Sequence, residues 1–345
     1  MIKFKHRIYK YLLFLRPLIY LAVIGSVLFL LIFFVPKLVA VFKSTAALVN
    51  PDITTLDSFR GRTNILLLGV GGGTHPGADL TDSIMLISIN LITADTVLIS
   101  LPRDIWVESL SAKLNAAYHS GEARQEGGGL ILTKAAVSEI INQPVHYAAL
   151  LDFSGFEAAI DIIGGLDINI PHGFIDKKYP IPGQENAESE TARFETVKFS
   201  SGEQHLDGPT ALKYVRSRQA EGEEGTDYAR AQRQQLVLLA FKDEVLSTRI
   251  LLNPSKLKAL INTFKTAVKT DLPPNTYPDF IKLVLRIKST GLRTGIIDQG
   301  SSSEEIPPLL YSPPANLYGQ WVLLPINHNW QAIYDHVAEI LYQNQ

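Results

Sequence analysis

The chain of 345 residues contains no cysteine and only two methionines. Without cysteine it forms no disulfide and no thiolate metal site, and the redox compartment stays undecided. The chain also lacks an excess of positive charge, because 32 Lys and Arg residues face 34 Asp and Glu residues, for a formal net charge of −2. General nucleic-acid-binding proteins are usually basic overall, so this balance argues against that class.

Two familiar nucleotide-binding motifs are also missing. An aliphatic run at residues 65–68 leads into a glycine-rich segment at 69–77. A Walker A loop would continue with Gly-Lys-Ser/Thr, but Gly73 is followed by Thr74 and His75, and Thr74 stands where a dinucleotide fingerprint needs glycine. The segment is therefore either a long flexible turn or a loop whose free backbone N–H groups approach a phosphate.

The N-terminus has the pattern of a membrane anchor. Residues 1–16 carry five Lys or Arg residues and no acid, and the twenty residues 17–36 are uncharged and mostly aliphatic or aromatic. At a rise of ~1.5 Å per residue, this segment spans about 30 Å, the thickness of a bilayer core. A cleaved signal peptide would have a shorter apolar region and a small-residue cleavage site, so an uncleaved anchor is favoured. The basic flank predicts a cytoplasmic N-terminus and an extracytoplasmic location for everything after about residue 40.

Composition along the chain predicts five segments: a cytoplasmic basic tail (1–16), a transmembrane helix (17–36), a stalk (37–61), a core domain (62–245) and a C-terminal α/β extension that packs on the core (246–345). Within the core, near-continuous aliphatic runs are typical of strands buried on both faces of an α/β sheet. These runs lie at residues 65–68, 84–89 and 97–100.

Other segments have helical or alternating apolar patterns. Helices are expected at 130–141, 153–163, 255–269, 278–290 and 330–342, and strands at 145–151, 166–170 and 321–324. Two polar segments interrupt these patterns. Residues 176–193 predict a mobile surface excursion, and the Glu- and Gly-rich residues 221–225 favour a solvated loop over a metal site.

Charged residues stand beside the aliphatic runs, where a buried core would not need them. Asp82 ends the glycine-rich loop, and Arg103 and Asp104 follow the run at 97–100. Ligand sites of α/β sheets tend to lie at strand ends and in the loops behind them. These three residues are therefore candidates for a site.

A second group of candidates is a cluster of arginines between residues 211 and 235. Arg216 and Arg218 would share one face if residues 214–218 are extended, because side chains alternate along a strand. Thr226 and Asp227 can cap a helix in which Arg230 and Gln234 share a face, with Arg233 beside them. The cluster is either a solubilising surface or a site where guanidiniums converge from two elements to grip phosphate in bidentate fashion.

Several motifs occur together in one order. They are Thr-Asp-Ser at 81–83, Ser-Leu-Pro-Arg-Asp at 100–104, Lys-Leu-Asn-Ala-Ala-Tyr at 113–118, Ile-Ile-Gly-Gly-Leu at 162–166, Gly-Glu-Gln-His-Leu-Asp-Gly at 202–208, Tyr-Val-Arg-Ser-Arg at 214–218 and Asp-Tyr-Ala-Arg-Ala-Gln-Arg-Gln-Gln at 227–235. With the single N-terminal anchor, this set resembles the LytR–CpsA–Psr family of bacterial envelope proteins. The resemblance covers about residues 62–245, and more loosely the chain to residue 342.

The resemblance implies a three-layer α-β-α sandwich with a central mixed sheet that holds a polyprenyl-pyrophosphate lipid. It implies transfer of a lipid-linked glycan, with its proximal phosphate, to a cell-wall acceptor such as a peptidoglycan hydroxyl. By motif position, Asp82 would help to hold Mg²⁺ and Lys113 would lie beside the site. The residues implied to contact the pyrophosphate are Arg103, Arg216, Arg218, Arg230 and Gln234.

The sequence departs from the family pattern at the expected metal site. Gly71 and Leu80 stand where the family usually has an aspartate and an arginine. Mg²⁺ typically uses one or two carboxylates, with water and phosphate oxygens as its other ligands. Asp79 therefore either replaces the missing carboxylate beside Asp82, or only caps the turn and leaves Asp82 as the single protein carboxylate.

The residue types also suit phosphoryl transfer without reference to the family, because that reaction needs charge neutralisation and in-line placement of a hydroxyl. Asp104, or a carboxylate near the metal, is a candidate to orient or deprotonate that hydroxyl. Two alternatives stay open: a module that binds polyprenyl lipid or glycan without turnover, and a polyprenyl-pyrophosphatase with water as acceptor. A DNA-binding regulator is the least favoured, given the anchor and the near-neutral charge.

Overall fold

The computed structural model describes residues 52–72, 77–181, 183–184, 187–287, 292–299 and 308–343. Its contacts define a large unit, Leu56–Pro274 with Leu283–Gln345, and a small unit of Asn275–Lys282 with the residues before Leu56. The basic tail, the apolar segment 17–36 and most of the expected stalk lie outside the described residues. Within the described ranges, no helix is both long enough and apolar enough to cross a membrane.

A mixed sheet forms the centre of the large unit, as predicted. Its strands follow the order β11-β6-β1-β2-β3-β12 in the described part of the chain. β1 is antiparallel to β2 and parallel to β6, and β3 is parallel to β12. The bounds are β1 Arg62–Val70, β2 Thr81–Asn90, β3 Thr96–Ser100, β6 Tyr147–Asp152, β11 Val268–Thr270 and β12 Arg293–Ile296.

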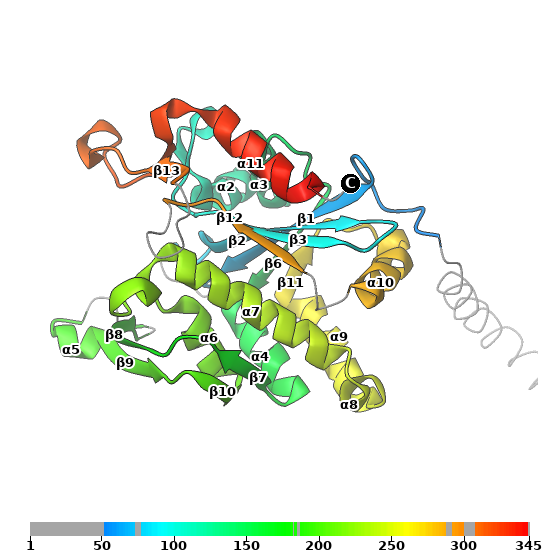
Figure 1. Cartoon of the computed structure of the whole chain (residues 1–345). Coiled ribbons are helices and arrows are strands. Elements are labelled where there is room, and N and C mark those ends of the chain that lie inside the picture. The colour runs from blue at the N-terminus through cyan, green and yellow to red at the C-terminus, as the bar shows by residue number, and fades with distance from the viewer. Residues whose placement is uncertain are drawn as a thin grey trace, which may run out of the picture. The chain divides into compact units, whose positions relative to one another are not determined.

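Helices cover both faces of this sheet (Figure 1). On one face lie α2 (Ala117–Arg124), α3 (Gly128–Ile141) and α11 (Trp330–Tyr342), and on the other lie α4 (Phe153–Ile163), α6 (Gly208–Arg216), α7 (Asp227–Val245) and α9 (Pro254–Ala267). α8 (Thr248–Leu251) connects α7 to α9, and α10 spans Tyr277–Arg286. The expected helices at 130–141, 153–163, 255–269 and 330–342 are thus confirmed to within a few residues.

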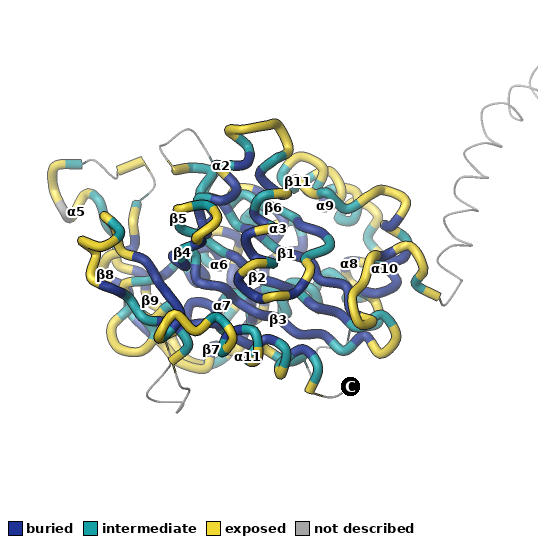
Figure 2. Tube along the Cα trace, turned by 90° about the horizontal axis from the view of Figure 1, so that it is seen from above, coloured by how far each residue is buried: buried dark blue, intermediate teal, exposed yellow. Residues whose placement is uncertain are grey.

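The two faces of the sheet are packed differently. Leu66 and Leu68 of β1 point into a core shared with α3 and α11, and Figure 2 shows the central strands as buried. Leu67 lies between them and, because side chains alternate along a strand, it faces the opposite side. There it lines a cavity instead of packing against helices. The second helical layer therefore encloses a space over the sheet.

Small sheets flank the second layer. β7 (Leu166–Ile170) pairs with β10 (Gly202–Leu206), and β8 (Phe174–Pro180) pairs with β9 (Phe194–Phe199). The expected surface excursion at 176–193 is partly wrong, because residues 176–180 belong to β8 and 190–193 form the short helix α5. Tyr179 and Val197 are buried, so the hairpin has an apolar inner face that its many charged residues conceal in the sequence.

The C-terminal extension also differs from the expected pattern in one place. The strand expected at 321–324 is reduced to β14 (Leu324–Pro325), which pairs with β13 (Leu310–Tyr311). The remaining short strands are β4 (Trp106–Val107) and β5 (Ala112–Lys113), which pair with each other. β11 and β12 come from the extension and form the two edges of the central sheet. The extension therefore completes the sheet in addition to packing on it.

Candidate active site

A cavity of about 1150 Å³ lies between the central sheet and the helices α4, α6, α7 and α9. Its walls are mostly apolar. The sheet contributes Leu67, Met85, Ala149 and Leu151, and the helices contribute Phe153, Phe156, Ile160, Val237, Leu238, Phe241 and Phe264. This volume exceeds what a small polar ligand needs, and the walls suit a long apolar group.

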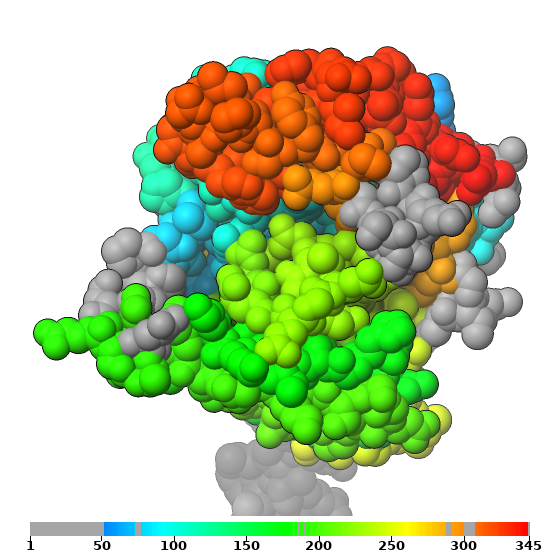
Figure 3. Space-filling model, turned by 60° about the vertical axis from the view of Figure 1, so that its left-hand side comes forward, coloured from blue at the N-terminus to red at the C-terminus, as the bar shows by residue number. Residues whose placement is uncertain are grey.

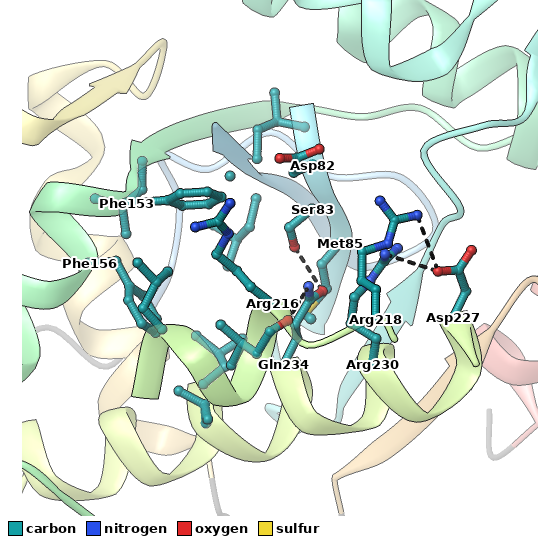
Figure 4. A pocket seen from close by; sticks show the side chains of 18 of the residues that line it. Asp82, Ser83, Met85, Phe153, Phe156, Arg216, Arg218, Asp227, Arg230 and Gln234 are labelled. Atoms are coloured by element: carbon teal, nitrogen blue, oxygen red, sulfur yellow. Dashed lines mark hydrogen bonds and ion pairs between the residues drawn. The ribbon is translucent and has the colours of Figure 1, made fainter. Parts of the chain in front are cut away.

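One end of the cavity is polar (Figure 4). Arg216 comes from the end of α6, Arg218 from the loop behind it, Arg230 and Gln234 from α7, and Asp82 from β2. Five of the residues implicated from the sequence therefore line one cavity. In Figure 3 the surface is hollowed between the orange C-terminal segment and the green segment below it, and residues coloured cyan to blue lie in its depth.

The expected extended conformation of residues 214–218 is wrong. α6 begins where Asp207 caps its N-terminus by accepting a hydrogen bond from Thr210 N at 2.9 Å, with Pro209 in its first turn, and it continues to Arg216. The helix ends at Ser217, whose backbone N–H bonds to Lys213 O. Arg216 and Arg218 still reach the same cavity, one from the last helical turn and the other from the loop.

α7 begins as expected. The side chain of Thr226 accepts a hydrogen bond from Ala229 N at 3.1 Å, and Arg230 and Gln234 lie on the cavity side of the helix (Figure 4). Gln234 is fixed by Ser83, whose hydroxyl donates to its Oε1 at 2.9 Å. The sequence reasoning did not single out Ser83, although its place directly after Asp82 on a predicted strand end was available as a signal.

Arg233 does not converge with the other arginines, contrary to the expectation. Its buried guanidinium donates to Ser217 O at 2.7 Å and to Tyr214 O at 3.0 Å. It also pairs with Glu224 at 2.8 Å. Arg233 therefore fixes the end of α6 and the connection to α7, and so helps to position the loop that carries Arg218.

The arginines at the polar end are charged groups in a desolvated environment. Burial lowers the pKa of Arg230 to about 10, with Asp227 opposing this change. Burial, and then the neighbouring charge of Arg103, also lowers the pKa of Arg218. Because a buried cation is stabilised by a nearby anion, this end of the cavity favours a bound anionic group.

Asp227 was not singled out as a site residue from the sequence. It lies 2.9 Å from Arg230 and 3.6 Å from Arg218. Its position three residues before Arg230, a known spacing for ion pairs on a helix, was an available signal. Two other carboxylates on the cavity wall have partners of their own. Asp152 accepts from Gly155 N at 2.7 Å, and Asp176 accepts from Arg218 N at 3.2 Å.

Arg216 is oriented by aromatic rings. Its guanidinium lies 4.4 Å from the centre of the Phe153 ring and 5.8 Å from that of Tyr179, and it donates to Tyr179 Oη at 3.4 Å. Stacking of this kind suits the planar guanidinium. It holds the charge at the boundary between the polar end and the apolar walls (Figure 4).

Arg103, Asp104 and Lys113 form a chain of ion pairs beside the cavity. Arg103 pairs with Asp82 and, at 3.4 Å, with Asp104, and Lys113 Nζ donates to Asp104 Oδ1 at 2.8 Å. The Asp104 side chain is only 4% exposed, and both of its oxygens have cationic partners. Asp82 lines the cavity, whereas Arg103, Asp104 and Lys113 do not. The structure therefore places Asp104 as a residue that orients Arg103 and Lys113.

The carboxylates expected at a metal site have different partners. Asp79 lies 2.7 Å from His119 Nδ1, and Asp82 pairs with Arg103. In the described ranges, no group of three or more His, Cys, Asp or Glu residues could hold a metal ion. Mg²⁺ can use a single carboxylate when water and phosphate oxygens complete its coordination. The residues present fit a site with Asp82 as its protein carboxylate.

The Glu- and Gly-rich segment at 221–225 has no metal-site arrangement. Residues Gly222–Gly225 form a short 3-10 turn, Glu221 pairs with Lys177 at 2.6 Å, and Glu224 pairs with Arg233. The segment is therefore a mostly exposed turn, as expected, and the buried Arg233 binds it through Glu224.

Comparisons with known proteins find relatives of this chain. A relative described as "Polyisoprenyl-teichoic acid--peptidoglycan teichoic acid transferase TagV", from Bacillus subtilis, is 26% identical over 61% of this chain and 49% of its own length. The transferase TagU from Oceanobacillus iheyensis is 29% identical over 64% of this chain and 62% of its own. The chain thus spans about half to three-fifths of the length of these relatives.

The fold is also found in a solved structure. The crystal structure of B. subtilis TagV matches with a TM-score of 0.57 at 22% identity, over 82% of this chain and 98% of that one. The model of the LytR_cpsA_psr family matches residues 39–299, which include all of the site residues described above. The chain belongs to the LytR–CpsA–Psr family.

Proposed function

We propose that this protein transfers a glycan, with its proximal phosphate, from a polyprenyl-pyrophosphate carrier to a peptidoglycan hydroxyl. The observation that carries the proposal is one cavity with an apolar body and an arginine-lined end. A polyprenyl pyrophosphate has the same two parts, a long apolar chain and a compact anionic head. The names of two relatives, teichoic acid transferases that act on peptidoglycan, support the same class of donor and acceptor.

In the proposed reaction, the acceptor oxygen attacks the phosphorus nearest the glycan. The bond from that phosphorus to the bridging oxygen breaks, polyprenyl monophosphate leaves, and the hydroxyl proton passes to a base or to water. Arg218 and Arg230 would bind and orient the pyrophosphate oxygens, because planar guanidiniums match phosphate in bidentate fashion. Arg216, held against Phe153, would bind at the junction of head and chain.

The apolar walls would exclude water from the donor, which strengthens the arginine contacts and disfavours hydrolysis. When bound at Asp82, Mg²⁺ would neutralise charge on the pyrophosphate. Asp104 would act indirectly, because it holds Arg103 and Lys113 in place. We do not assign the proton to Asp104, since both of its oxygens are already paired with cations.

The experiment that tests this function is a transfer assay with the purified full chain. The donor is a polyprenyl pyrophosphate with a labelled glycan, and the acceptor is purified peptidoglycan. The expected products are labelled peptidoglycan and polyprenyl monophosphate in equal amounts. Polyprenyl monophosphate without labelled peptidoglycan would indicate a pyrophosphatase, and donor binding without either product would indicate a binding module.

The proposal also includes the location of the domain. We propose that residues 17–36 anchor the chain in the cell membrane in a single pass, with residues 1–16 in the cytoplasm and the cavity outside. Because the chain has no cysteine, Ser189→Cys provides one accessible thiol on an exposed segment. This thiol should react with an impermeant reagent on intact cells. Reaction only after lysis would contradict the topology.

A further inference from the structure

The segment that includes α8 and α9 has an unusual charge. Residues 245–270 contain five Lys or Arg residues and no Asp or Glu, although the chain as a whole has a net charge of −2. The five are Arg249, Lys256, Lys258, Lys265 and Lys269. Arg249 is partly neutralised by Glu244 at 2.9 Å, and Lys256 donates to Ile163 O. Within the described ranges, Lys258 and Lys265 form no ion pair, so their charges are available at the surface.

The same segment exposes large apolar side chains. Leu251 is 43% exposed, Leu252 is 81% exposed and Ile261 is 53% exposed. Along α9, Pro254, Lys258, Ile261 and Lys265 recur at spacings of four, three and four, which places them on one helical face, and all four are exposed. This outer face therefore combines apolar and basic residues and contains no acid.

An adjacent face of α9, about 100° around the helix, belongs to the cavity and its surrounding core. Leu260 is buried, Leu257 packs against the core that contains α4, and Phe264 lines the cavity. A single helix therefore has the cavity wall on one face and the basic, apolar surface on the neighbouring face.

The position of this surface relative to the cavity follows from α7. Arg230 and Gln234, near the start of α7, line the polar end, and Leu238 and Phe241, two to three turns later, line the apolar walls. α8 begins three residues after α7 ends. In Figure 1, α8 and α9 lie at the end of α7 that is farther from the β8–β9 hairpin. The basic and apolar surface therefore lies toward the apolar end of the cavity.

We infer that the outer face of α8–α9, here called the basic apolar face, docks on an anionic lipid bilayer. It comprises Leu251, Leu252, Lys258, Ile261 and Lys265. Exposed leucine and isoleucine flanked by lysines are typical of surfaces that insert shallowly at the headgroup boundary and are attracted to anionic lipids. This inference rests on the proposed function, because it assigns the orientation in which the apolar end of the cavity receives a lipid chain from the bilayer.

Lipid contact can be tested without relying on turnover. The full chain carrying Leu252→Cys is labelled with an environment-sensitive dye and reconstituted into vesicles of phosphatidylglycerol or of phosphatidylcholine. Nitroxide-labelled lipids then report contact by quenching. The matched control is Leu317→Cys, which replaces a leucine that is 67% exposed in the C-terminal segment. We expect at least threefold stronger quenching at position 252 than at 317 in phosphatidylglycerol vesicles, and a weaker difference in phosphatidylcholine vesicles.

Charge reversal tests the lysines. Lys258→Glu with Lys265→Glu should abolish the excess quenching at position 252. The same change in net charge at Lys177→Glu with Lys198→Glu, on the β8–β9 hairpin, should leave it unchanged. Quenching at position 252 that is the same with both lipids, and the same with and without the α9 lysine substitutions, would overturn the inference. A dye signal that follows the protein-to-lipid ratio instead would point to a second copy of the chain on this face, and would also overturn it.

The readouts separate this inference from the proposed function. If no variant transfers glycan but quenching still follows Lys258 and Lys265, the proposed function fails and the docking surface stands. If transfer proceeds and the α9 double variant loses neither quenching nor activity toward vesicle-embedded donor, the docking surface fails alone. If both stand, that double variant should lose at least fivefold in rate with vesicle-embedded donor. It should keep its rate with a detergent-dispersed, short-chain donor.

Discussion

The carboxylate of Asp227 pairs with Arg230 at 2.9 Å, one turn further along α7. The same oxygen lies 3.6 Å from Arg218, so one carboxylate pairs with two guanidiniums that belong to different elements (Figure 4). Their positive charge is only partly neutralised at this point, and desolvation makes the remainder costly. A bound pyrophosphate would complete the neutralisation. This relationship makes the polar end the most sensitive part of the site to substitution.

The first prediction concerns Arg218. Arg218→Ala should weaken binding of a polyprenyl-pyrophosphate analogue by ~2–5 kcal/mol, because it breaks a desolvated charge pair. Arg218→Lys should also bind weakly, because an ammonium offers a point charge in place of a planar fork. Isothermal titration calorimetry measures both effects. The control is Arg124→Ala, at an exposed position at the end of α2, and affinities equal to wild type in both Arg218 variants would return this residue to a solubilising role.

The second prediction separates the two aspartates of the expected metal site. Asp82→Ala should abolish Mg²⁺-dependent turnover, whereas Asp79→Ala should leave the Mg²⁺ concentration for half-maximal activity within twofold of wild type. The reason is that Asp82 lines the cavity, whereas Asp79 does not line it and pairs with His119 at 2.7 Å. A tenfold rise in that concentration for Asp79→Ala, about 1.4 kcal/mol, would show that Asp79 is a ligand after all. Full activity in Asp82→Ala would remove the metal site.

The third prediction concerns Asp176, a buried residue of β8. Its carboxylate accepts hydrogen bonds from the backbone N–H groups of Arg218 and Gln219, each at 3.2 Å. Asp176→Asn should reduce the free energy of unfolding by ~1–3 kcal/mol, since it weakens charge-assisted bonds inside the protein. It should also weaken donor binding, because the loop that carries Arg218 loses its support. Denaturant titration and calorimetry measure the two effects, with exposed Asp167→Asn as the control.

The fourth prediction concerns Arg233, which is buried but lies outside the site. Arg233→Met should reduce the free energy of unfolding by about 3–5 kcal/mol, because it leaves the Glu224 carboxylate and three backbone carbonyls without their partner. Arg233→Lys should restore little of this, since four separate acceptor atoms need a guanidinium fork. Denaturant titration measures the change. A stable Arg233→Met variant with weakened donor binding would instead place Arg233 among the substrate contacts.

The fifth prediction is a dependence of stability on alkaline pH. Burial raises the pKa of Tyr214 to about 12, above the usual value of about 10 for a tyrosine. A raised native pKa means that the neutral phenol stabilises the fold below pH 10, and that this contribution is lost as pH rises from about 10 to about 12. The melting temperature of Tyr214→Phe should therefore fall less steeply than that of the wild type as pH rises over this range, when melting temperatures are measured at successive pH values. Tyr334→Phe, at a surface hydroxyl, is the control, and equal slopes in both variants would contradict the assignment.

The sequence was sufficient for the main elements of the fold. Aliphatic runs predicted the buried strands β1, β2 and β3, and helical spacing predicted α3, α4, α9 and α11, because these patterns are local. The order of motifs was sufficient for the family. The sequence also predicted a capping residue, since Thr226 caps the N-terminus of α7 as expected.

Local patterns failed where distant residues decided the conformation. Residues 214–216 were expected to be extended, but Tyr214 is buried in the last turns of α6, where its ring packs against Phe174 and Phe199 of the β8–β9 hairpin. The hairpin β8–β9 looked polar, because its few buried residues are separated by charged ones. The pairing of the two strands, in which Phe174 lies opposite Phe199, places these buried residues on one face of the hairpin.

The sequence by itself determined which residue types were available for a site: an aspartate after a glycine-rich loop, and four arginines between residues 216 and 233. Only the tertiary structure decided how they are used. It turned Arg216, Arg218 and Arg230 toward one cavity and buried Arg233 against backbone carbonyls. It also paired Asp79 with His119, and Asp104 with two cations. The physical reason is that a charged side chain takes the partner that the packing of distant segments brings within reach, and sequence spacing does not specify that partner.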